Sequence, residues 1–258
     1  MLLQDKVAVV YGAGGAIGGA VARAFAGDGA KVFVTGRSLA PVKALAEAIA
    51  GAEPAEVDAL DERAVEEHLR CVVDQAGRVD ISFNAMGVPN AQMLGVALTE
   101  VDADVFARPI AAYTTSYFLT ARLAARQMIP NRSGVIMTVS ALPARSGTGL
   151  NGGYGPAQAA KEAMTRDLSF ELAPHGIRVV ALRPHGIPQT STLKEVFELK
   201  ATAGATWEQF QERLAGTTHP RRGTTLEELA NMAVLAASDR ASGMTATTVN
   251  LTMGSLDD

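Results

Sequence analysis

The sequence has little of the material that several classes of protein need. Its 258 residues include a single cysteine, Cys71, so neither a disulfide within the chain nor a cluster of thiolate metal ligands can form. The 23 basic and 27 acidic residues give a net charge of −4, and the basic residues are scattered. We therefore expect no metal site, and no binding to nucleic acid or to an anionic membrane. Cys71 follows a helical run, and we expect a buried structural thiol.

Signals for export and for several domains are also missing. The N-terminus, MLLQDKVAVV, lacks a charged segment followed by a long apolar stretch, and glycines interrupt the apolar residues that come next. We expect a cytoplasmic protein. The chain shows no repeat, linker or low-complexity tract, and its 48% of apolar residues can bury one large core. The sequence therefore predicts a single domain over residues 1–258.

Short apolar runs alternate with alanine-rich helical patterns along the chain. Most of the strand runs are continuously apolar, which is typical of strands buried on both faces of a parallel sheet. The regular alternation predicts an α/β Rossmann fold, with a doubly wound parallel sheet and helices on both faces, and ligands bind such sheets beyond the carboxyl ends of the strands. We predict strands at 6–11, 31–36, 55–60, 79–85, 134–140, 178–184 and 246–251, and helices near 17–28, 40–50, 61–76, 101–128, 155–173 and 226–237.

The first predicted strand leads directly into a glycine-rich turn and a helix, in VVYGAGGAIGGAVARAF. Glycines allow a phosphate to approach the backbone closely, and the helix N-terminus offers it free N–H groups and a partial positive charge. This context predicts a dinucleotide phosphate site. The alternative is a glycine turn that serves tight packing alone.

The end of the second predicted strand favours NADP(H) over NAD(H). A carboxylate at this position accepts hydrogen bonds from the adenosine ribose of NAD and repels the 2′-phosphate of NADP. Here the position holds Gly36, and Arg37 follows it. The guanidinium group presents a planar set of donors that suits a phosphate. The alternative for Arg37 is an ordinary solvated arginine.

Together with three later segments, these features resemble the short-chain dehydrogenase/reductase family over nearly the whole chain. The turn GAGGAIG is similar to the family's glycine turn, NAMG at 84–87 to a strand end, and ELAPHGIRVVALRPHGI at 171–187 to the sixth-strand region. The resemblance implies a homotetramer built partly through the helices at 101–128 and 155–173. The cofactor-binding residues that it implies are Gly12, Gly14, Gly15, Ala16, Ile17, Gly18, Arg37, Ser38, Asp58, Ala59, Asn84, Ala85, Gly87 and Ile187.

The resemblance also implies a catalytic chemistry. Hydride transfer to a carbonyl leaves an alkoxide, which family members protonate with a tyrosine; a nearby lysine stabilises the phenolate that remains. Tyr154, in GGYGPAQAAKEAM, matches that tyrosine. The family's lysine position is held by Gln158, its serine position by Ala141 and its asparagine position by Tyr113.

Lys161 and Ser140 are therefore expected in shifted supporting roles, beside Tyr154 as the proton donor. Lys161 lies seven residues after Tyr154 on the same helical face, at ~10 Å along the axis instead of the ~6 Å of an i+4 pair. Enoyl-carrier-protein reductases share this tyrosine-to-lysine spacing but not its register. The alternative for Lys161 is a solvated lysine on the helix surface.

Two histidines and one long segment remain to be placed. His185 stands where the family usually has glycine; it either supplies a proton near neutral pH or simply replaces that glycine. His68 is expected on a helix surface. Residues 188–222 carry Phe197, Trp207 and Phe210 at helical spacing, which indicates a mobile lid and an apolar substrate, or else an ordinary amphipathic helix pair.

Two functions follow. One is an NADP(H)-dependent oxidoreductase that reduces a carbonyl or an activated alkene of a small apolar substrate. The other is an NADP-binding protein that has lost catalysis and acts as a scaffold, a sensor or the inactive partner in an assembly.

Overall fold

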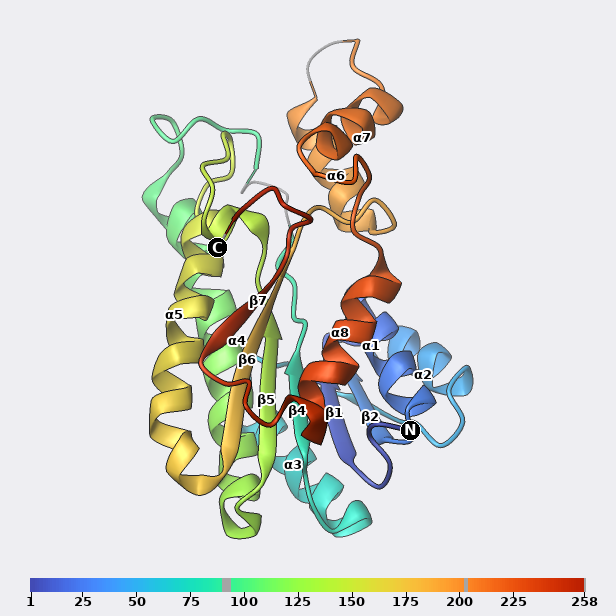
Figure 1. The fold of residues 1–258 in the computed structure, drawn as a ribbon. Coiled ribbons are helices and arrows are strands. Elements are labelled where there is room, and N and C mark those ends of the chain that lie inside the picture. Colours follow the sequence, from blue (N-terminus) through green and yellow to red (C-terminus); the bar gives the residue numbers. More distant parts are fainter. Residues whose placement is uncertain (90–93, 202–203, 258) are drawn as a thin grey trace.

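A computed structural model describes residues 1–89, 94–201 and 204–257 of the chain (Figure 1). Its parallel strands form one seven-stranded sheet in the order β3-β2-β1-β4-β5-β6-β7. The chain builds this sheet outward from β1 in both directions, so the order reverses between β1 and β4. The strands are β1 (Val7–Tyr11), β2 (Lys31–Gly36), β3 (Glu53–Glu56), β4 (Ile81–Asn84), β5 (Gly134–Val139), β6 (Ile177–Pro184) and β7 (Thr247–Leu251).

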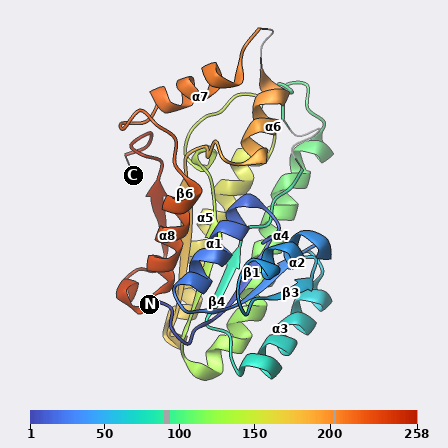
Figure 2. The same cartoon turned by 90° about the vertical axis from the view of Figure 1, so that its right-hand side faces the viewer.

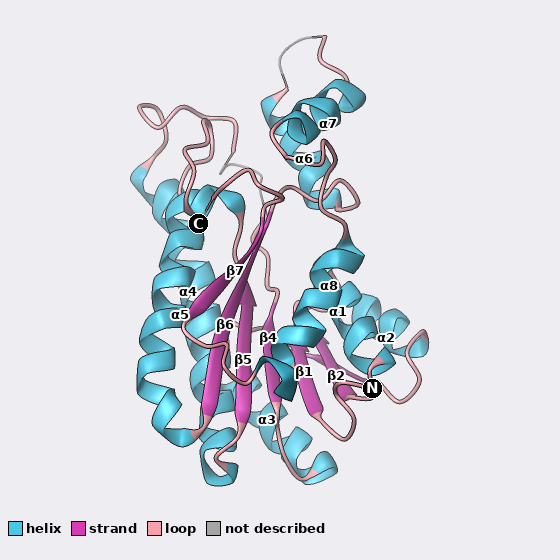
Figure 3. Ribbon diagram, in the orientation of Figure 1, coloured by secondary structure: helices cyan, strands magenta, loops and turns pink. Residues whose placement is uncertain are grey.

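Helices cover both faces of the sheet, as Figure 3 shows in a single colour for all helices. One apolar core joins the sheet to α1, α2 and α8, and the other joins it to α3, α4 and α5. This arrangement confirms the predicted α/β fold with a doubly wound parallel sheet. The helices are α1 (Ala16–Gly27), α2 (Leu39–Glu47), α3 (Glu62–Ala76), α4 (Ala103–Met128), α5 (Tyr154–Leu172), α6 (Ser191–Lys200), α7 (Trp207–Gly216) and α8 (Leu226–Ala237).

The helices α6 and α7 lie apart from these two layers. Figure 2 shows them beyond the carboxyl ends of the strands, above the sheet and the other helices. Both fall within the segment 188–222 that the sequence singles out, of which residues 202–203 lie outside the described part. The fold therefore places this helix pair at the edge of the sheet where ligands bind.

The third strand differs from the prediction. It was expected at 55–60 but forms at Glu53–Glu56, because the residues after it make a turn and a helix cap. The Asp58 carboxylate accepts a hydrogen bond from the backbone N–H of Leu60, at 3.0 Å, and Asp61 caps α3 through the N–H groups of Arg63 and Ala64. Aspartate in these patterns ends a strand and begins a helix.

Two expectations on α3 are wrong. Val65, Leu69 and Val72 form the buried stripe of this helix, and His68 lies within that stripe, 8% exposed and edge-on to the ring of Phe33. Burial lowers the pKa of His68 to about 4. Cys71 is turned away from the stripe and is exposed, so it is not a buried structural thiol.

Candidate active site

A cavity of about 910 Å³ lies beyond the carboxyl ends of the strands, at the point between β1 and β4 where the strand order reverses. It extends from the glycine turn before α1 to α6 and α7, and most of the predicted cofactor residues and all of the predicted catalytic ones line it. The cofactor candidates that line it are Gly12, Gly14, Gly15, Ala16, Ile17, Gly18, Arg37, Ser38, Ala59, Ala85, Gly87 and Ile187.

The glycines of the turn before α1 differ in what they contact. Gly12 has φ +72°, and a Cβ there would lie 2.6 Å from the carbonyl oxygen of Ala85; a Cβ at Gly18 would collide with the carbonyl of Gly12. Packing therefore explains these two glycines. It does not explain Gly15, where the nearest atom to an added Cβ lies at 3.4 Å. Gly15 caps α1 without any side-chain hydrogen bond, and Gly15, Ala16 and Ile17 line the cavity. The N–H groups in the first turn of a helix lack partners within the helix, which suits them to bind a phosphate.

Asp58 and Asn84 lie outside the cavity lining. The Asp58 side chain is exposed and holds the turn after β3. Asn84 is 1% exposed; its Nδ2 donates to Thr120 Oγ1 at 3.0 Å, and its Oδ1 accepts from the N–H of Met86 at 3.2 Å. Asn84 thus fixes the loop that carries Ala85 and Gly87 into the cavity. A direct cofactor contact by either residue stays a prediction.

The structure brings Tyr154 and Lys161 together on one wall of the cavity. Tyr154 is the first residue of α5, and its ring packs edge-to-face on the ring of Tyr113 from α4, with 5.9 Å between centroids. The Nζ atom of Lys161 lies 5.3 Å from the centroid of the same Tyr113 ring. Tyr113 is fixed in turn, because its hydroxyl accepts a hydrogen bond from the N–H of Val88 at 3.2 Å. Tyr113 therefore stands between the proposed acid and the cation.

The electrostatics of Tyr154 favour its protonated form. Burial raises its pKa above the usual value of a tyrosine, and the neighbouring Tyr113 raises it further. Among the residues described, no hydrogen-bond partner of the Tyr154 hydroxyl is found. At neutral pH this group carries a proton that it is able to donate.

Lys161 is not a solvated helix residue. Its side chain is 1% exposed, because this face of α5 packs against the sheet and α4, and its Nζ donates to the backbone carbonyl of Val139 at the end of β5. Side chains on a helix lean toward its N-terminus, which carries the ammonium group of Lys161 up to Tyr113. Burial lowers the pKa of Lys161 to about 7, although the charge of Glu162 opposes the shift.

Ser140 lies at the cavity wall, but its hydroxyl is bound in a buried network. It donates to Glu162 Oε1 at 2.7 Å. The carboxylate of Glu162 also receives two hydrogen bonds from the guanidinium of Arg183, both at 2.8 Å. All three side chains are nearly fully buried. A supporting role for Ser140 in catalysis stays a prediction.

Sequence reasoning missed Glu162 and Arg183. A signal was present in the run RVVALRP, where Arg183 follows apolar residues on a strand predicted to be buried. A charged side chain in such a place requires a partner of opposite charge. The sequence does not say which carboxylate supplies it, because Glu162 lies on a helix that packs across the strand.

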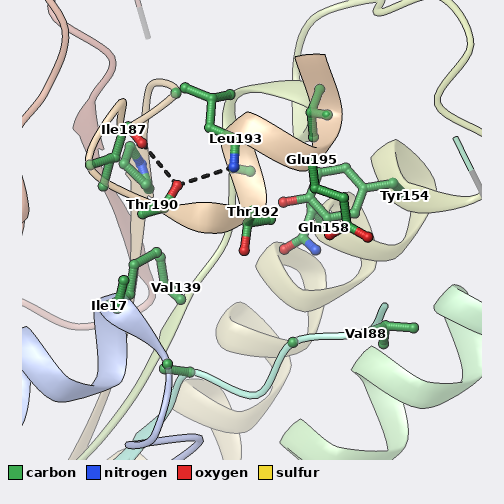
Figure 4. A pocket seen from close by; sticks show the side chains of 18 of the residues that line it. Ile17, Val88, Val139, Tyr154, Gln158, Ile187, Thr190, Thr192, Leu193 and Glu195 are labelled. Carbon is green, nitrogen blue, oxygen red and sulfur yellow. Dashed lines mark hydrogen bonds between the residues drawn. The ribbon is translucent and has the colours of Figure 1, made fainter. Parts of the chain in front are cut away.

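The wall beside Tyr154 also carries polar groups. Gln158 and Tyr154 of α5 line the same cavity as Thr192 and Glu195 of α6, and Figure 4 draws all four. Gln158 is 2% exposed, and no hydrogen bond of its amide is found within the described residues. The amide borders the cavity, where its N–H and C=O groups are available to a bound ligand.

The start of α6 is built to project into the cavity. The hydroxyl of Thr190 donates to the carbonyl of Ile187 at 2.8 Å and accepts from the N–H of Leu193 at 3.2 Å, as the dashed lines in Figure 4 show. This cap fixes the direction in which α6 leaves β6. The helix then turns an apolar side toward the cavity.

Apolar side chains form the part of the cavity wall that α6 and α7 contribute. The rings of Phe197, Trp207 and Phe210 contact one another with centroids 5.4 to 5.6 Å apart, and Phe197 and Phe210 also line the cavity with Leu193, Val196 and Leu214. The two interpretations of this segment are therefore compatible, since an amphipathic helix pair covers the cavity. Its mobility as a lid stays a prediction.

His185 lines the cavity but is tied to the segment after α7. Its Nε2 lies 3.1 Å from Thr217 Oγ1, and that hydroxyl donates to the carbonyl of Leu214, so the imidazole N–H is the donor between them. Burial lowers the pKa of His185, which makes the ring neutral at pH 7. The contact links β6 to the helix pair, and a catalytic role for His185 stays open.

Two features are absent from the described residues. No helix in residues 1–89, 94–201 and 204–257 combines the length and the hydropathy that a membrane span requires. Within those same residues, no group of three or more His, Cys, Asp and Glu side chains is placed to hold a metal ion.

Known proteins share both the sequence pattern and the fold. Residues 12–255 match the family model described as enoyl-(acyl carrier protein) reductase. Secoisolariciresinol dehydrogenase of Forsythia intermedia is 31% identical over 243 residues, which cover 93% of this chain and 84% of that protein.

Solved structures extend the comparison to the cofactor. NAD⁺-bound xylitol dehydrogenase has a TM-score of 0.90 at 25% identity, covering 98% of this chain and 100% of its own. A variant of actinorhodin polyketide ketoreductase with NADPH has a TM-score of 0.89 at 25% identity, with 100% of both chains covered. The glycine turn at the start of α1 is thus consistent with a nicotinamide cofactor. The similar solved structures include both NAD⁺ and NADPH complexes.

Proposed function

Because this chain belongs to the short-chain dehydrogenase/reductase family, we propose that it is an NADP(H)-dependent oxidoreductase that reduces a carbonyl or an activated alkene of a small, mainly apolar substrate. The oxidoreductase class follows from the family. One observation supports the rest of the proposal: Tyr154 and Lys161 line the same cavity as the glycine turn and Arg37.

The cofactor would be held by groups at one end of the cavity. The N–H groups at the start of α1 would bind its pyrophosphate, and Arg37 with Ser38 would bind the 2′-phosphate of NADP(H). When bound, a reduced nicotinamide supplies a hydride to an electrophilic carbon of the substrate. The remaining task for the protein is to protonate the charge that develops on the substrate oxygen, or on the adjacent carbon of an alkene.

Tyr154 carries the proton for that step. Its raised pKa keeps it protonated at neutral pH but also makes it a weak acid, so a positive charge near the phenolate is required. Lys161 is a buried cation of this wall, and its ammonium group and the ring of Tyr154 both contact the ring of Tyr113. Since the pKa of Lys161 is lowered to about 7, the charge is present at acidic and neutral pH and lost above it.

The substrate is proposed to be mainly apolar with one polar group. Phe197, Phe210 and Leu214 would cover its apolar part. Gln158 lines the cavity one helical turn after Tyr154 and would face a hydroxyl or another polar group next to the reacting carbon (Figure 4).

NADPH consumption with a panel of ketones and enones tests this function. Turnover of at least one panel member is expected from the wild-type protein. Tight NADPH binding without turnover of any panel member would favour the second candidate, a protein that binds NADP and has lost catalysis. That candidate is supported by the bond that withholds the Ser140 hydroxyl and by the uncharged Gln158 at the family's lysine position.

We also propose a homotetramer, with a second copy of the chain covering the outer faces of α4 and α5. Phe118 on α4 is 43% exposed and Phe170 on α5 is 86% exposed, which is unusual for residues of this size. Sedimentation velocity is expected to give a tetramer for the wild type and a smaller species for Phe170→Asp. A monomeric wild type would contradict the proposal.

A further inference from the structure

A carboxylate is present beside Gly36, although the sequence has none at that position. The strands β2 and β3 are parallel neighbours, and their register pairs Gly36 with Glu56. Both residues end their strands, so Glu56 stands at the same height on the ligand-binding edge of the sheet. Gly36 carries no acid that would repel the 2′-phosphate of NADP(H), but Glu56 on the adjacent strand supplies one.

The Glu56 side chain reaches across the turn between β2 and α2. Its Oε2 accepts a hydrogen bond from the backbone N–H of Leu39, at 3.0 Å. Leu39 is the first residue of α2, where N–H groups lack helical partners and carry a partial positive charge. Ser38, the N-cap, makes no side-chain hydrogen bond to the helix, so Glu56 takes the place of the usual cap.

The same turn carries the groups that would bind a 2′-phosphate. Arg37 and Ser38 line the cavity, immediately before the Leu39 N–H. A phosphate that uses Arg37 and Ser38 comes close to this amide, and it meets the negative charge of Glu56 there. Like charges at short range repel, and a carboxylate and a phosphate cannot both accept the one hydrogen bond that Leu39 offers.

We propose that Glu56 is a cofactor-specificity residue, whose carboxylate competes with the 2′-phosphate of NADP(H) for the N-terminus of α2 and so weakens the preference for NADP(H) over NAD(H). NADP(H) binds only as Glu56 leaves the Leu39 amide, whereas NAD(H) leaves that contact in place. The inference rests on the proposed function in one respect, that a nicotinamide dinucleotide binds along the glycine turn.

The Glu56→Gln variant isolates the charge, because glutamine has the same length and retains a carbonyl oxygen that is able to accept from Leu39. Dissociation constants are measured by fluorescence for NADPH and NADH, and by calorimetry for the fragments 2′,5′-ADP and 5′-ADP. Glu56→Gln is expected to bind NADPH and 2′,5′-ADP about five- to tenfold more tightly, with NADH and 5′-ADP within about twofold of the wild type. The gain should shrink at high salt, because the groups involved are exposed.

Glu53→Gln is the matched control. Glu53 is exposed at the other end of β3, so this variant removes the same charge from the same strand away from the cavity. All four affinities should stay at wild-type values. An equal gain from Glu53→Gln would show that only the net charge matters and would overturn the assignment.

Other outcomes separate this inference from the function on which it rests. Tight binding of both dinucleotides with an unchanged NADPH to NADH ratio in Glu56→Gln overturns the role of Glu56 alone. A loss of NADH affinity with unchanged NADPH affinity also overturns it, because Glu56 then holds the ribose hydroxyls. A wild-type protein that binds neither dinucleotide overturns the proposed function, and the role of Glu56 with it.

Discussion

The two halves of the cavity are built on different principles. In the cofactor half, at the ends of β1 and β4, the shape depends on backbone, and Gly12 and Gly18 are positions where a single added carbon would clash. In the catalytic half, on α4 and α5, the chemistry depends on side chains. By resemblance to the family, Tyr113 and Gln158 there occupy the positions of an asparagine and a lysine. Side chains are replaced without disturbing the helix that bears them, so a fold predicts the first half better than the second.

The catalytic half also holds a cluster of buried charges. Glu162 and Arg183 satisfy each other through two hydrogen bonds, with Ser140 as a third member. Lys161 donates to the carbonyl of Val139 and lies over the ring of Tyr113, and burial lowers its pKa although the charge of Glu162 opposes the shift. A buried ionisable group that is poorly compensated and faces a cavity is typical of a functional site.

In the cofactor half, the largest loss of NADPH affinity is expected from Gly18→Ala. Its Cβ would force the turn away from the carbonyl of Gly12, and NADPH affinity should fall by at least ~100-fold because the phosphate site depends on that turn. Gly27→Ala is the control, since an added Cβ at the end of the same helix meets nothing within 4 Å. Wild-type affinity in Gly18→Ala, measured by NADPH fluorescence, would show that the turn is not the phosphate site.

In the catalytic half, Lys161→Met should lower the rate of reduction by about 30-fold at pH 6, with little change in NADPH affinity. The wild-type rate should fall as pH rises through about 7, because Lys161 loses the charge that stabilises the phenolate. Lys161→Arg keeps its charge at all these pH values and should flatten the decline. A wild-type rate that rises through pH 7, measured as kcat/KM for a panel substrate, would contradict a role for the charged lysine.

Lys161→Met should also stabilise the folded protein. The folded pKa of Lys161, about 7, lies below the ordinary 10.5, so the unfolded chain binds more protons between these values and stability rises with pH across that window. At pH 7 the wild type still bears most of the cost of burying the lysine, and Lys161→Met should raise the free energy of unfolding by about 2 kcal/mol. Urea titration at pH 7 and pH 10 checks this. If Lys161→Met raised the free energy of unfolding more at pH 10 than at pH 7, the lowered pKa of Lys161 would be contradicted.

The smallest effect is expected from Gln158→Lys, which returns a charge to the family's lysine position. The reduction rate should rise about threefold at pH 8, where Lys161 is largely neutral, and less at pH 6, where Lys161 already supplies a charge. Gln158→Met, of similar size and without charge, serves as the control. An equal gain from both variants would attribute the effect to the loss of the amide.

The strand, turn and helix of the cofactor half could be predicted from the sequence for a physical reason. Strand, glycine turn and helix follow one another within Val7–Gly27, so their arrangement is local and readable from residue order. The contacts that the sequence did not reveal join distant elements. The Ser140 hydroxyl meets Glu162 across β5 and α5, and Glu56 reaches α2 from β3, a strand whose end was predicted four residues too late.

The burial of a single side chain on a helix is also not predictable from the order of residues alone. Lys161 was compatible with a solvated position by its spacing alone, and only the packing of α5 on the sheet and α4 excludes that position. Conversely, Cys71 has an apolar side chain by type but lies outside the buried stripe of α3. Both depend on how a helix is rotated against its neighbours, which the tertiary packing decides.

The most direct test of the account is Tyr154→Phe, assayed for turnover and for NADPH affinity in the same preparation. The substitution keeps the ring that packs on Tyr113 and removes only the proton-bearing hydroxyl. The account predicts a loss of turnover of at least ~1000-fold with an NADPH dissociation constant within about twofold of the wild type, because acid catalysis and cofactor binding belong to different halves of the cavity. Wild-type turnover in Tyr154→Phe would contradict it, and Tyr154 would then be a packing residue.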